Sequence, residues 1–259
     1  MKHPKFLRNQ IQLEKQQAYR AIPVMAALTA PFFVAEVRDY TKLYDFSTDA
    51  PFPLYTFLQF PLFIIFTDFG IYWVHRGLHH PWVYKNLHKP HHKWIISTPF
   101  ASYAFHPLDG WAQSVSYHVY PFLFPLQKWA YLALFMFVTV WTVMIRMAPS
   151  SFGYNKLHSI RLINPDDGEY AMNSPIVNGS ACHTIHHYYF NYNYGQYTTL
   201  WDRLGGSYRK PDAALFNRET RMEQSEIDKQ VKEMNRLVKE IEGTDERCYE
   251  TAAEPKKVR

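Results

Sequence analysis

Long apolar runs separated by histidine-rich polar segments constrain the fold of this chain more than any other feature. The runs cover residues 21–37, 52–74 and 111–145. The first is close to the shortest length with which an α-helix crosses a bilayer, and the second is long enough to do so. A buried core helix is the alternative for residues 21–37. The pattern favours an all-α integral membrane protein with a histidine-rich domain at the membrane face.

The third apolar run contains the polar or helix-breaking residues Pro121, Pro125, Gln127 and Lys128. If this run crossed the membrane once, the last histidine motif would lie on the opposite face from the first two. We therefore expect residues 111–145 to enter the membrane and return, with a turn near the second proline. Hydropathy alone does not decide between the two topologies.

The charges are consistent with a protein on a membrane surface. The formal net charge is +5, but no long Lys/Arg run or nucleic-acid-binding motif accompanies it, so we expect no nucleic-acid partner. Lys85, Lys89 and Lys93 make the histidine-rich segment basic, which predicts the cytosolic side. The two cysteines, Cys182 and Cys248, form no disulfide framework, which suits a reducing compartment.

Three short motifs contain eight of the thirteen histidines. They are His75-x3-His79, His88-x2-His91-His92 and His183-x2-His186-His187. Residues three and four apart share one face of a helix, so each motif directs its imidazoles the same way. Pro90 requires a helix at the second motif to begin close to His88. Single histidine pairs often occur on helix faces by accident, but three such motifs near the ends of apolar runs indicate a metal site.

The composition of the motifs restricts the metal. A closed structural zinc site uses four ligands and often cysteine, whereas these motifs offer eight imidazoles and no thiolate. Imidazole suits zinc, copper, iron and nickel. Eight nitrogens divide naturally over two ions with positions left open, which favours a pair of iron ions that activate oxygen for a lipid substrate. A histidine-rich metal transporter is the alternative class, but it would place ligands inside the apolar runs, which contain almost none.

Two longer segments resemble a known family. "DFGIYWVHRGLHHPWVYKNLHKPHHKWIISTPFASYAFHPLDG" and "NGSACHTIHHYYFNYNYGQYTTLWDRLGGSYRKP" are similar to the fatty acid hydroxylase and sterol desaturase superfamily, and most similar to the fungal C-5 sterol desaturases of the lathosterol oxidase type. The resemblance extends from "HPKFLRNQ" to about Phe216. It implies a multi-pass enzyme of the endoplasmic reticulum membrane with its histidine boxes facing the cytosol.

The resemblance also implies a reaction, cofactors and partners. The enzyme would introduce the C5–C6 double bond into a Δ7-sterol such as episterol, in ergosterol biosynthesis, with two non-haem iron ions and O2. Electrons would come from NADH through cytochrome b5 and its reductase, and basic residues around the motifs suit the docking of acidic cytochrome b5. A lipid hydroxylase or a C-4 methyl sterol oxidase of the same superfamily is the alternative, and a defective isoform is another.

By motif match, the resemblance implies eight metal ligands. They are His75, His79, His88, His91, His92, His183, His186 and His187. His80 falls outside the first motif, while His106 is a candidate for a ligand or supporting role. Asp68, Asp109 and Asp202 are candidates to accept a ring N–H and so fix the imidazole tautomers.

One segment departs from the family pattern. The resemblance implies that "WTVMI" is followed directly by "HDGEY", but in this chain residues 146–166 stand between the two. If the codons are CGT-ATG for Arg146-Met147 and CCA-GAT for Pro165-Asp166, the segment begins and ends like an intron, and its removal joins C to AT and restores a histidine codon. We therefore interpret residues 146–166 as a retained intron that leaves the chain without one expected histidine. His158 has no motif to support it as a replacement.

The sequence predicts three parts. Residues 1–20 are a polar, basic N-terminal segment, residues 21–213 form the membrane-embedded domain, and residues 214–259 form a charged amphipathic helix and tail. Family members usually have a further apolar region upstream, so we expect the N-terminus to be incomplete.

Overall fold

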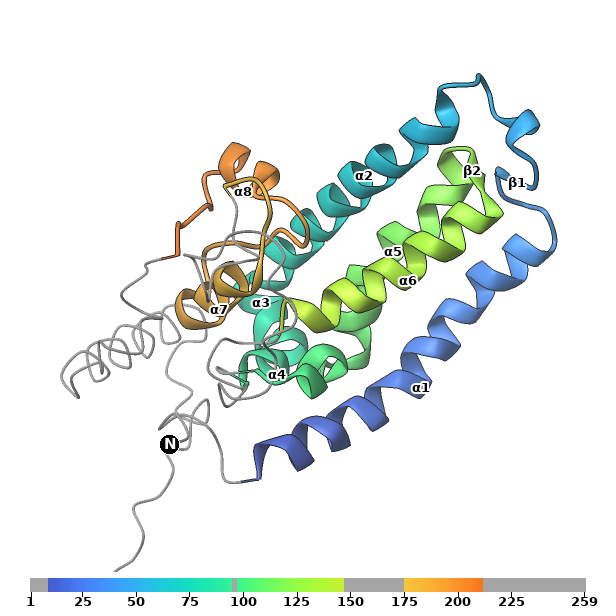
Figure 1. The fold of residues 1–259 in the computed structure, drawn as a ribbon. Coiled ribbons are helices and arrows are strands. Elements are labelled where there is room, and N and C mark those ends of the chain that lie inside the picture. The colour runs from blue at the N-terminus through green and yellow to red at the C-terminus, as the bar shows by residue number, and fades with distance from the viewer. Residues whose placement is uncertain (1–8, 95–96, 147–174, 212–259) are drawn as a thin grey trace, which may run out of the picture.

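Long helices form an elongated bundle, and short helices that carry the histidines gather at one end of it (Figure 1). The structure is a computed structural model that describes residues 9–94, 97–146 and 175–211. The long helices are α1 (Gln10–Val37), α2 (Tyr55–Leu78), α5 (Pro107–Leu123) and α6 (Lys128–Met144). The described part of the chain is thus mostly helical, as predicted.

Helix α1 joins two segments that the sequence separates. Residues 10–20 and the first apolar run form one continuous helix, which tolerates prolines at positions 23 and 31. Its first turns dock onto the histidine-bearing end, because buried Glu14 accepts a hydrogen bond from the Thr98 hydroxyl and Gln17 accepts one from Trp94 Nε1 at 3.1 Å. The rest of α1 is mostly exposed. Near its other end, Glu36 accepts a hydrogen bond from the Tyr131 hydroxyl at 3.0 Å, so the helix is attached at both ends and has a largely exposed outer face.

Helices α2 and α5 approach each other closely at a glycine. A Cβ added to Gly70 would lie 2.6 Å from Ser116 Cβ, so only glycine permits this separation. Small residues at helix contacts are typical of membrane bundles, where close packing replaces the hydrophobic effect between helices. Around this contact α2, α5 and α6 share an apolar core. Its buried members are Phe63, Ile71, Tyr117, Tyr120, Leu126, Ala130, Tyr131, Leu134, Val138 and Tyr197.

Residues 111–145 form a helical hairpin, as predicted, while its entry into a membrane stays a prediction. Helix α5 ends at Leu123, and after the short strand β2 (Leu126–Gln127) the chain returns as α6. Strand β2 pairs in parallel with β1 (Leu43–Tyr44), so the loop after α1 covers the turn. The start of α5 and the end of α6 consequently lie at the same end of the bundle (Figure 1).

Short helices build the histidine-bearing end. They are α3 (Pro81–Val83), η2 (Tyr84–His88), α4 (Lys89–His92), η3 (Pro99–Tyr103), α7 (Ser180–Tyr189) and α8 (Leu200–Leu204). The short helix η1 (Ser47–Asp49) lies at the opposite end, beside β1. This division separates an apolar bundle from a polar, histidine-rich cap.

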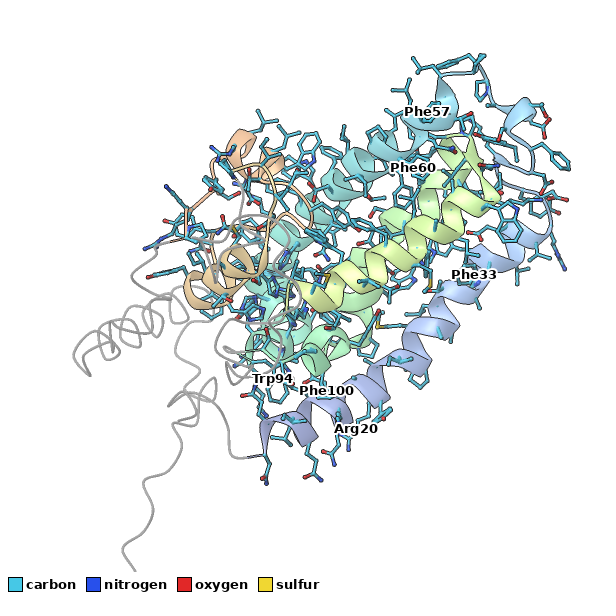
Figure 2. All side chains as sticks on the ribbon, viewed as in Figure 1. Arg20, Phe33, Phe57, Phe60, Trp94 and Phe100 are labelled. Carbon is cyan, nitrogen blue, oxygen red and sulfur yellow. The ribbon has the colours of Figure 1, made fainter. Side chains whose placement is uncertain are left out.

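Two of the described helices, α1 and α2, are long and apolar enough to cross a membrane by length and composition. Large apolar side chains are exposed on both helices, including Val37 on α1 and Phe57 and Phe60 on α2, and the two phenylalanines are labelled in Figure 2. These features suggest membrane association. The predicted C-terminal helix lies outside the described residues, as does the segment 146–166 except for Arg146.

Candidate metal centre

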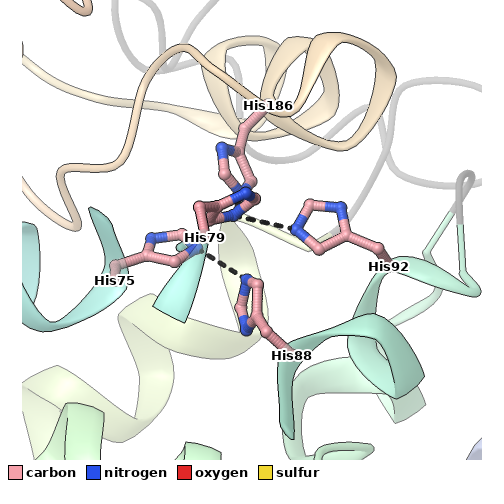
Figure 3. A group of neighbouring side chains, drawn as sticks. All are labelled: His75, His79, His88, His92 and His186. Carbon is pink, nitrogen blue, oxygen red and sulfur yellow. Dashed lines mark hydrogen bonds between the residues drawn. The ribbon is translucent and has the colours of Figure 1, made fainter. Parts of the chain in front are cut away.

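Five imidazoles from four separate elements converge at the end of the bundle (Figure 3). Each offers one nitrogen, and these nitrogens all lie within 4.8 Å of one another. We call this set the five-histidine group. It contains His75 and His79 from the end of α2, His88 from η2, His92 from α4 and His186 from α7.

Local helix geometry brings these side chains together. His75 lies in the last turn of α2 and His79 caps it, so the spacing of four residues places both rings on one face. His88 is the N-cap of α4, and Pro90 occupies its first turn, where a missing N–H costs little. The sequence prediction of a helix beginning at His88 is therefore confirmed.

Three of the five rings have an oxygen acceptor at Nδ1. The pairs are His75 with the Tyr194 carbonyl at 2.9 Å, His88 with Asp109 Oδ2 at 2.8 Å, and His186 with the Tyr192 carbonyl at 2.7 Å. Carbonyl and carboxylate oxygens only accept, so each Nδ1 carries the proton and donates it. In a neutral ring, Nε2 is then left with a free lone pair.

Two of these free lone pairs face each other, because His75 Nε2 lies 3.2 Å from His88 Nε2. The Nε2 atoms of the other rings also lie close together, since His79 Nε2 is 3.3 Å from His186 Nε2 and 3.2 Å from His92 Nε2. Two unprotonated nitrogens cannot bond each other, and a cation between them removes the repulsion. The spacing suits nitrogens that share one ion at about 2.1 Å. The five-histidine group therefore fits a metal ion.

Burial favours the neutral form of three of these rings. It lowers the pKa of His79, His92 and His186 well below the ordinary 6.5, and the neighbouring imidazoles lower it further. Only the neutral imidazole has a lone pair for a metal. The site is thus prepared to bind a cation near neutral pH.

A second set, the three-histidine group, lies beside the first. His91 from α4 and His183 and His187 from α7 offer nitrogens that also lie within 4.8 Å of one another. His183 Nε2 is 3.0 Å from His187 Nε2, and the Phe105 ring stacks on His91 with centroids 4.6 Å apart.

The three-histidine group already holds a cation from the protein. Arg146 Nη1 lies 3.1 Å from Nε2 and 3.3 Å from Nδ1 of His91, and the arginine is 5% exposed. Burial lowers the pKa of Arg146 to about 10, which leaves it protonated at neutral pH. With Arg146 in this position, the three-histidine group does not fit a metal ion.

The structure brings all eight predicted histidines into these two groups, and their role as ligands stays a prediction. His80 is exposed and lies outside both groups. His106 is the N-cap of α5, where its Nδ1 accepts from the Leu108 backbone N–H at 3.3 Å. A structural role in the helix cap therefore accounts for His106.

The three candidate carboxylates differ in what they contact. Asp109 accepts from His88, as the sequence analysis suggested. Asp68 accepts instead from the backbone N–H groups of residues 196–198, and Asp202 from those of Tyr194 and Gly195. Both therefore shape the loop after α7, which presents carbonyls to the imidazoles.

Sequence reasoning missed the two carbonyl acceptors and the contact of Arg146. Every residue has a carbonyl, so no sequence signal marks the two that meet a ring N–H. Tyr192 and Tyr194 do lie in the polar loop directly after the third motif, which narrows the search. For Arg146, its place immediately after an apolar helix that returns to the histidines was a usable signal.

An apolar cavity of about 780 Å³ lies between α1, α5 and α6 and extends to Phe105 and Arg146, the two residues that contact His91. Its volume is within the range of small-molecule sites. Apolar side chains of these helices line most of it, while Phe105 and Arg146 line it beside His91. The arrangement places a lipid-sized apolar space next to the histidine groups.

The family model of the fatty acid hydroxylases matches residues 60–207, a range that contains every histidine of both groups. The chain belongs to the fatty acid hydroxylase family. No solved structure matches it.

Within this family the chain is similar to curated fungal proteins. It is 68% identical over 250 residues to the Delta(7)-sterol 5(6)-desaturase erg3B of Aspergillus fumigatus, with 96% of this chain and 69% of that protein covered. The probable Delta(7)-sterol 5(6)-desaturase of Neurospora crassa is 58% identical, with 96% and 67% covered. The Delta(7)-sterol 5(6)-desaturase ERG3 of Saccharomyces cerevisiae is 50% identical, with 98% of this chain and 65% of that protein covered.

Proposed function

We propose that this member of the fatty acid hydroxylase family is a Δ7-sterol 5(6)-desaturase, an O2-dependent oxidoreductase that introduces the C5–C6 double bond into a sterol such as episterol. The convergence of eight buried imidazoles from the three motifs beside an apolar cavity carries the proposal. Its similarity to fungal Delta(7)-sterol 5(6)-desaturases favours this reaction over hydroxylation or C-4 demethylation.

In the active form proposed below, which has one histidine in place of residues 146–166, the eight histidines would hold two iron ions. Imidazole suits iron, and the five-histidine group fits one ion as it stands. When bound, the iron pair would supply oxygen activation, which no side chain provides. Asp109 and the carbonyls of Tyr192 and Tyr194 orient the rings of His88, His186 and His75 and place a proton on Nδ1, because each accepts an Nδ1–H.

The cavity would hold the sterol. The carbon that bears the sterol hydroxyl is only two bonds from C5, so polar groups must lie near the histidine end. Thr142 lines the cavity one helical turn before Arg146, and the side-chain amide of Gln196 donates to its hydroxyl at 3.2 Å. We assign these two residues to the sterol hydroxyl, and the apolar remainder of the cavity to the rings and side chain.

Further partners follow from the same proposal. The reaction consumes electrons, for which NADH through cytochrome b5 and its reductase is the proposed source. We place the protein in the endoplasmic reticulum membrane with the histidine groups on the cytosolic side, because Lys85, Lys89 and Lys93 surround the second motif.

We also propose that residues 146–166 are a retained intron and that the active form has a single histidine in their place. Arg146 then stands where the active form has an imidazole, at the end of α6 and in contact with His91. A retained intron would explain why the five-histidine group fits a metal ion whereas the three-histidine group does not. Sequencing of the messenger RNA tests it, since finding only the longer form would contradict it.

Complementation of a yeast strain that lacks C-5 sterol desaturase tests the function. We expect the version with one histidine in place of residues 146–166 to restore C5–C6 unsaturated sterols, and the same version with His79→Ala to restore none. Immunoblotting of membranes confirms that both proteins accumulate. Rescue by the His79→Ala version, or no product from the accumulated short version, would contradict the proposal, and full rescue by the longer chain would contradict the retained intron.

A further inference from the structure

We infer that this chain, with residues 146–166 present, binds one metal ion and not two, because Arg146 occupies the three-histidine group. The inference rests on the proposed function only for the expectation that a complete site holds two ions. The five-histidine group takes the single ion, and the second position is filled by a guanidinium of the chain itself.

The end of α6 fixes the position of Arg146. Ile145 caps the helix, and the backbone N–H of Arg146 donates to the Val143 carbonyl at 3.2 Å. The side chain is thereby directed into the histidine-bearing end, where its guanidinium lies 4.9 Å from the centre of the Phe105 ring. Both the backbone and the aromatic contact hold the cation beside His91.

Arg146 occupies the space beside His91. Its Nη1 lies almost equally far from the two ring nitrogens, 3.1 Å from Nε2 and 3.3 Å from Nδ1, so the guanidinium lies over the face of the imidazole. A guanidinium has five N–H donors and no acceptor, so it cannot itself serve as a metal ligand. A metal ion held by His91, His183 and His187 would have to share this space with a cation.

The positive charge of Arg146 also opposes binding of a metal ion in the three-histidine group. A unit positive charge about 4 Å from a divalent ion is strongly repelled, even at an effective dielectric constant of about 20. Arg146 is buried, so solvent does little to screen this repulsion. The five-histidine group has the opposite arrangement, since the carboxylate of Asp109 bonds the ring of His88 and favours a cation.

Arg146 also lies between the cavity and the second group, because it lines the cavity and contacts His91. A sterol in the cavity would meet a charged guanidinium where the active form has an imidazole. The same side chain therefore accounts for both a missing ion and an impaired approach of the substrate.

Metal counting on the purified full chain tests the inference without any turnover. The protein in detergent micelles is titrated with Co(II), and the bound metal is counted by mass spectrometry and by visible absorption. We expect one equivalent for the unmodified chain, with a second equivalent at least about a thousandfold weaker. For Arg146→His we expect two equivalents, and for Arg146→Met a second equivalent of intermediate affinity.

Matched variants identify which of the two histidine groups binds the single metal ion. His79→Ala should weaken binding of the single equivalent of the unmodified chain, whereas His91→Ala should leave its affinity unchanged. Arg20→His adds a histidine at an exposed position of α1 and should leave the count at one. Two tight equivalents in the unmodified chain would overturn the inference whether or not the variants fold, and so would a folded Arg146→His variant that binds only one.

The outcomes separate this inference from the proposed function. An Arg146→His variant that binds two ions but forms no sterol product contradicts the function and leaves the inference standing. An unmodified chain that binds two ions contradicts the inference and leaves the function standing.

Discussion

Replacement of Asp109 by asparagine tests how the protein orients the five-histidine group. Asp109 is fully buried and accepts two hydrogen bonds, from His88 Nδ1 at 2.8 Å and from Gln113 Nε2 at 2.7 Å. Asparagine keeps the shape but has one oxygen and one NH2 group in place of two oxygens. Either His88 Nδ1–H or the Gln113 amide N–H therefore meets the NH2 group of the asparagine, unless one of these two partners rearranges.

The two partners do not rearrange at equal cost. Gln113 can rotate its amide and present its oxygen. If His88 lost its Nδ1 acceptor, it would favour the tautomer with the proton on Nε2, which lies 3.2 Å from His75 Nε2 and would place a proton where the metal binds. Loss of such a supporting partner lowers metal affinity about 10–100-fold, which corresponds to about 1.4–2.8 kcal/mol. Asp109→Ala leaves a buried N–H without a partner, which costs a further ~1–3 kcal/mol.

Competition with a chelator measures the effect on the tightly bound ion of the purified chain. We expect Asp109→Asn to lower the affinity within this range and Asp109→Ala to lower it further. The control is Asp45→Asn, because Asp45 is 60% exposed and pairs with Lys128 at 2.9 Å, an interaction of little energetic value. Unchanged affinity in a folded Asp109→Asn variant would refute the assigned role of Asp109.

Further predictions concern packing, the loop after α7, and pH. Gly70→Val should lower the free energy of unfolding by about 1–3 kcal/mol because the added atoms overlap α5, whereas Gly77→Ala, which meets open space, should not lower it. Chemical denaturation in detergent compares the two variants. Asp68→Ala removes the acceptor of three backbone N–H groups and should lower the free energy of unfolding by about 3 kcal/mol or more. An unchanged melting temperature would contradict the role of Asp68 in holding this loop. Burial lowers the pKa of His79, His92 and His186, so near and below pH 6.5 the unfolded chain binds more protons than the folded chain. The metal-free protein should therefore lose stability as the pH falls from 7.5 to 5.5. An unchanged melting temperature over this range would contradict the assignment of these rings as neutral and buried.

The sequence predicted the helical class, the hairpin and the histidines that gather at the site. Apolar runs report helix length, and the spacing within each motif reports a shared face, so both can be read without a structure. The hairpin at α5 and α6 followed from a topological argument, because only a returning segment lets His183 meet His79. Hydropathy could not have given that answer, since the proline and lysine near the turn are compatible with either topology.

Other features could not be read from the sequence because they depend on tertiary contacts. The two histidine groups divide the motifs unequally, with His91 separated from its neighbours in the second motif, and no spacing rule predicts that division. The union of residues 10–20 with the first apolar run depends on Glu14 and Gln17, whose partners lie far along the chain. The contact of Arg146 with His91 likewise joins positions 55 residues apart.

Analysis of the sterol product tests the central claim most directly. Membranes that contain the version with one histidine in place of residues 146–166 are incubated with NADH, O2 and a Δ7-sterol that carries deuterium at C5 and C6. We predict a product that has lost one hydrogen isotope from each carbon and gained a C5–C6 double bond, with no added oxygen. A hydroxylated sterol or a sterol oxidised at C-4, formed with both labels retained, would contradict the account.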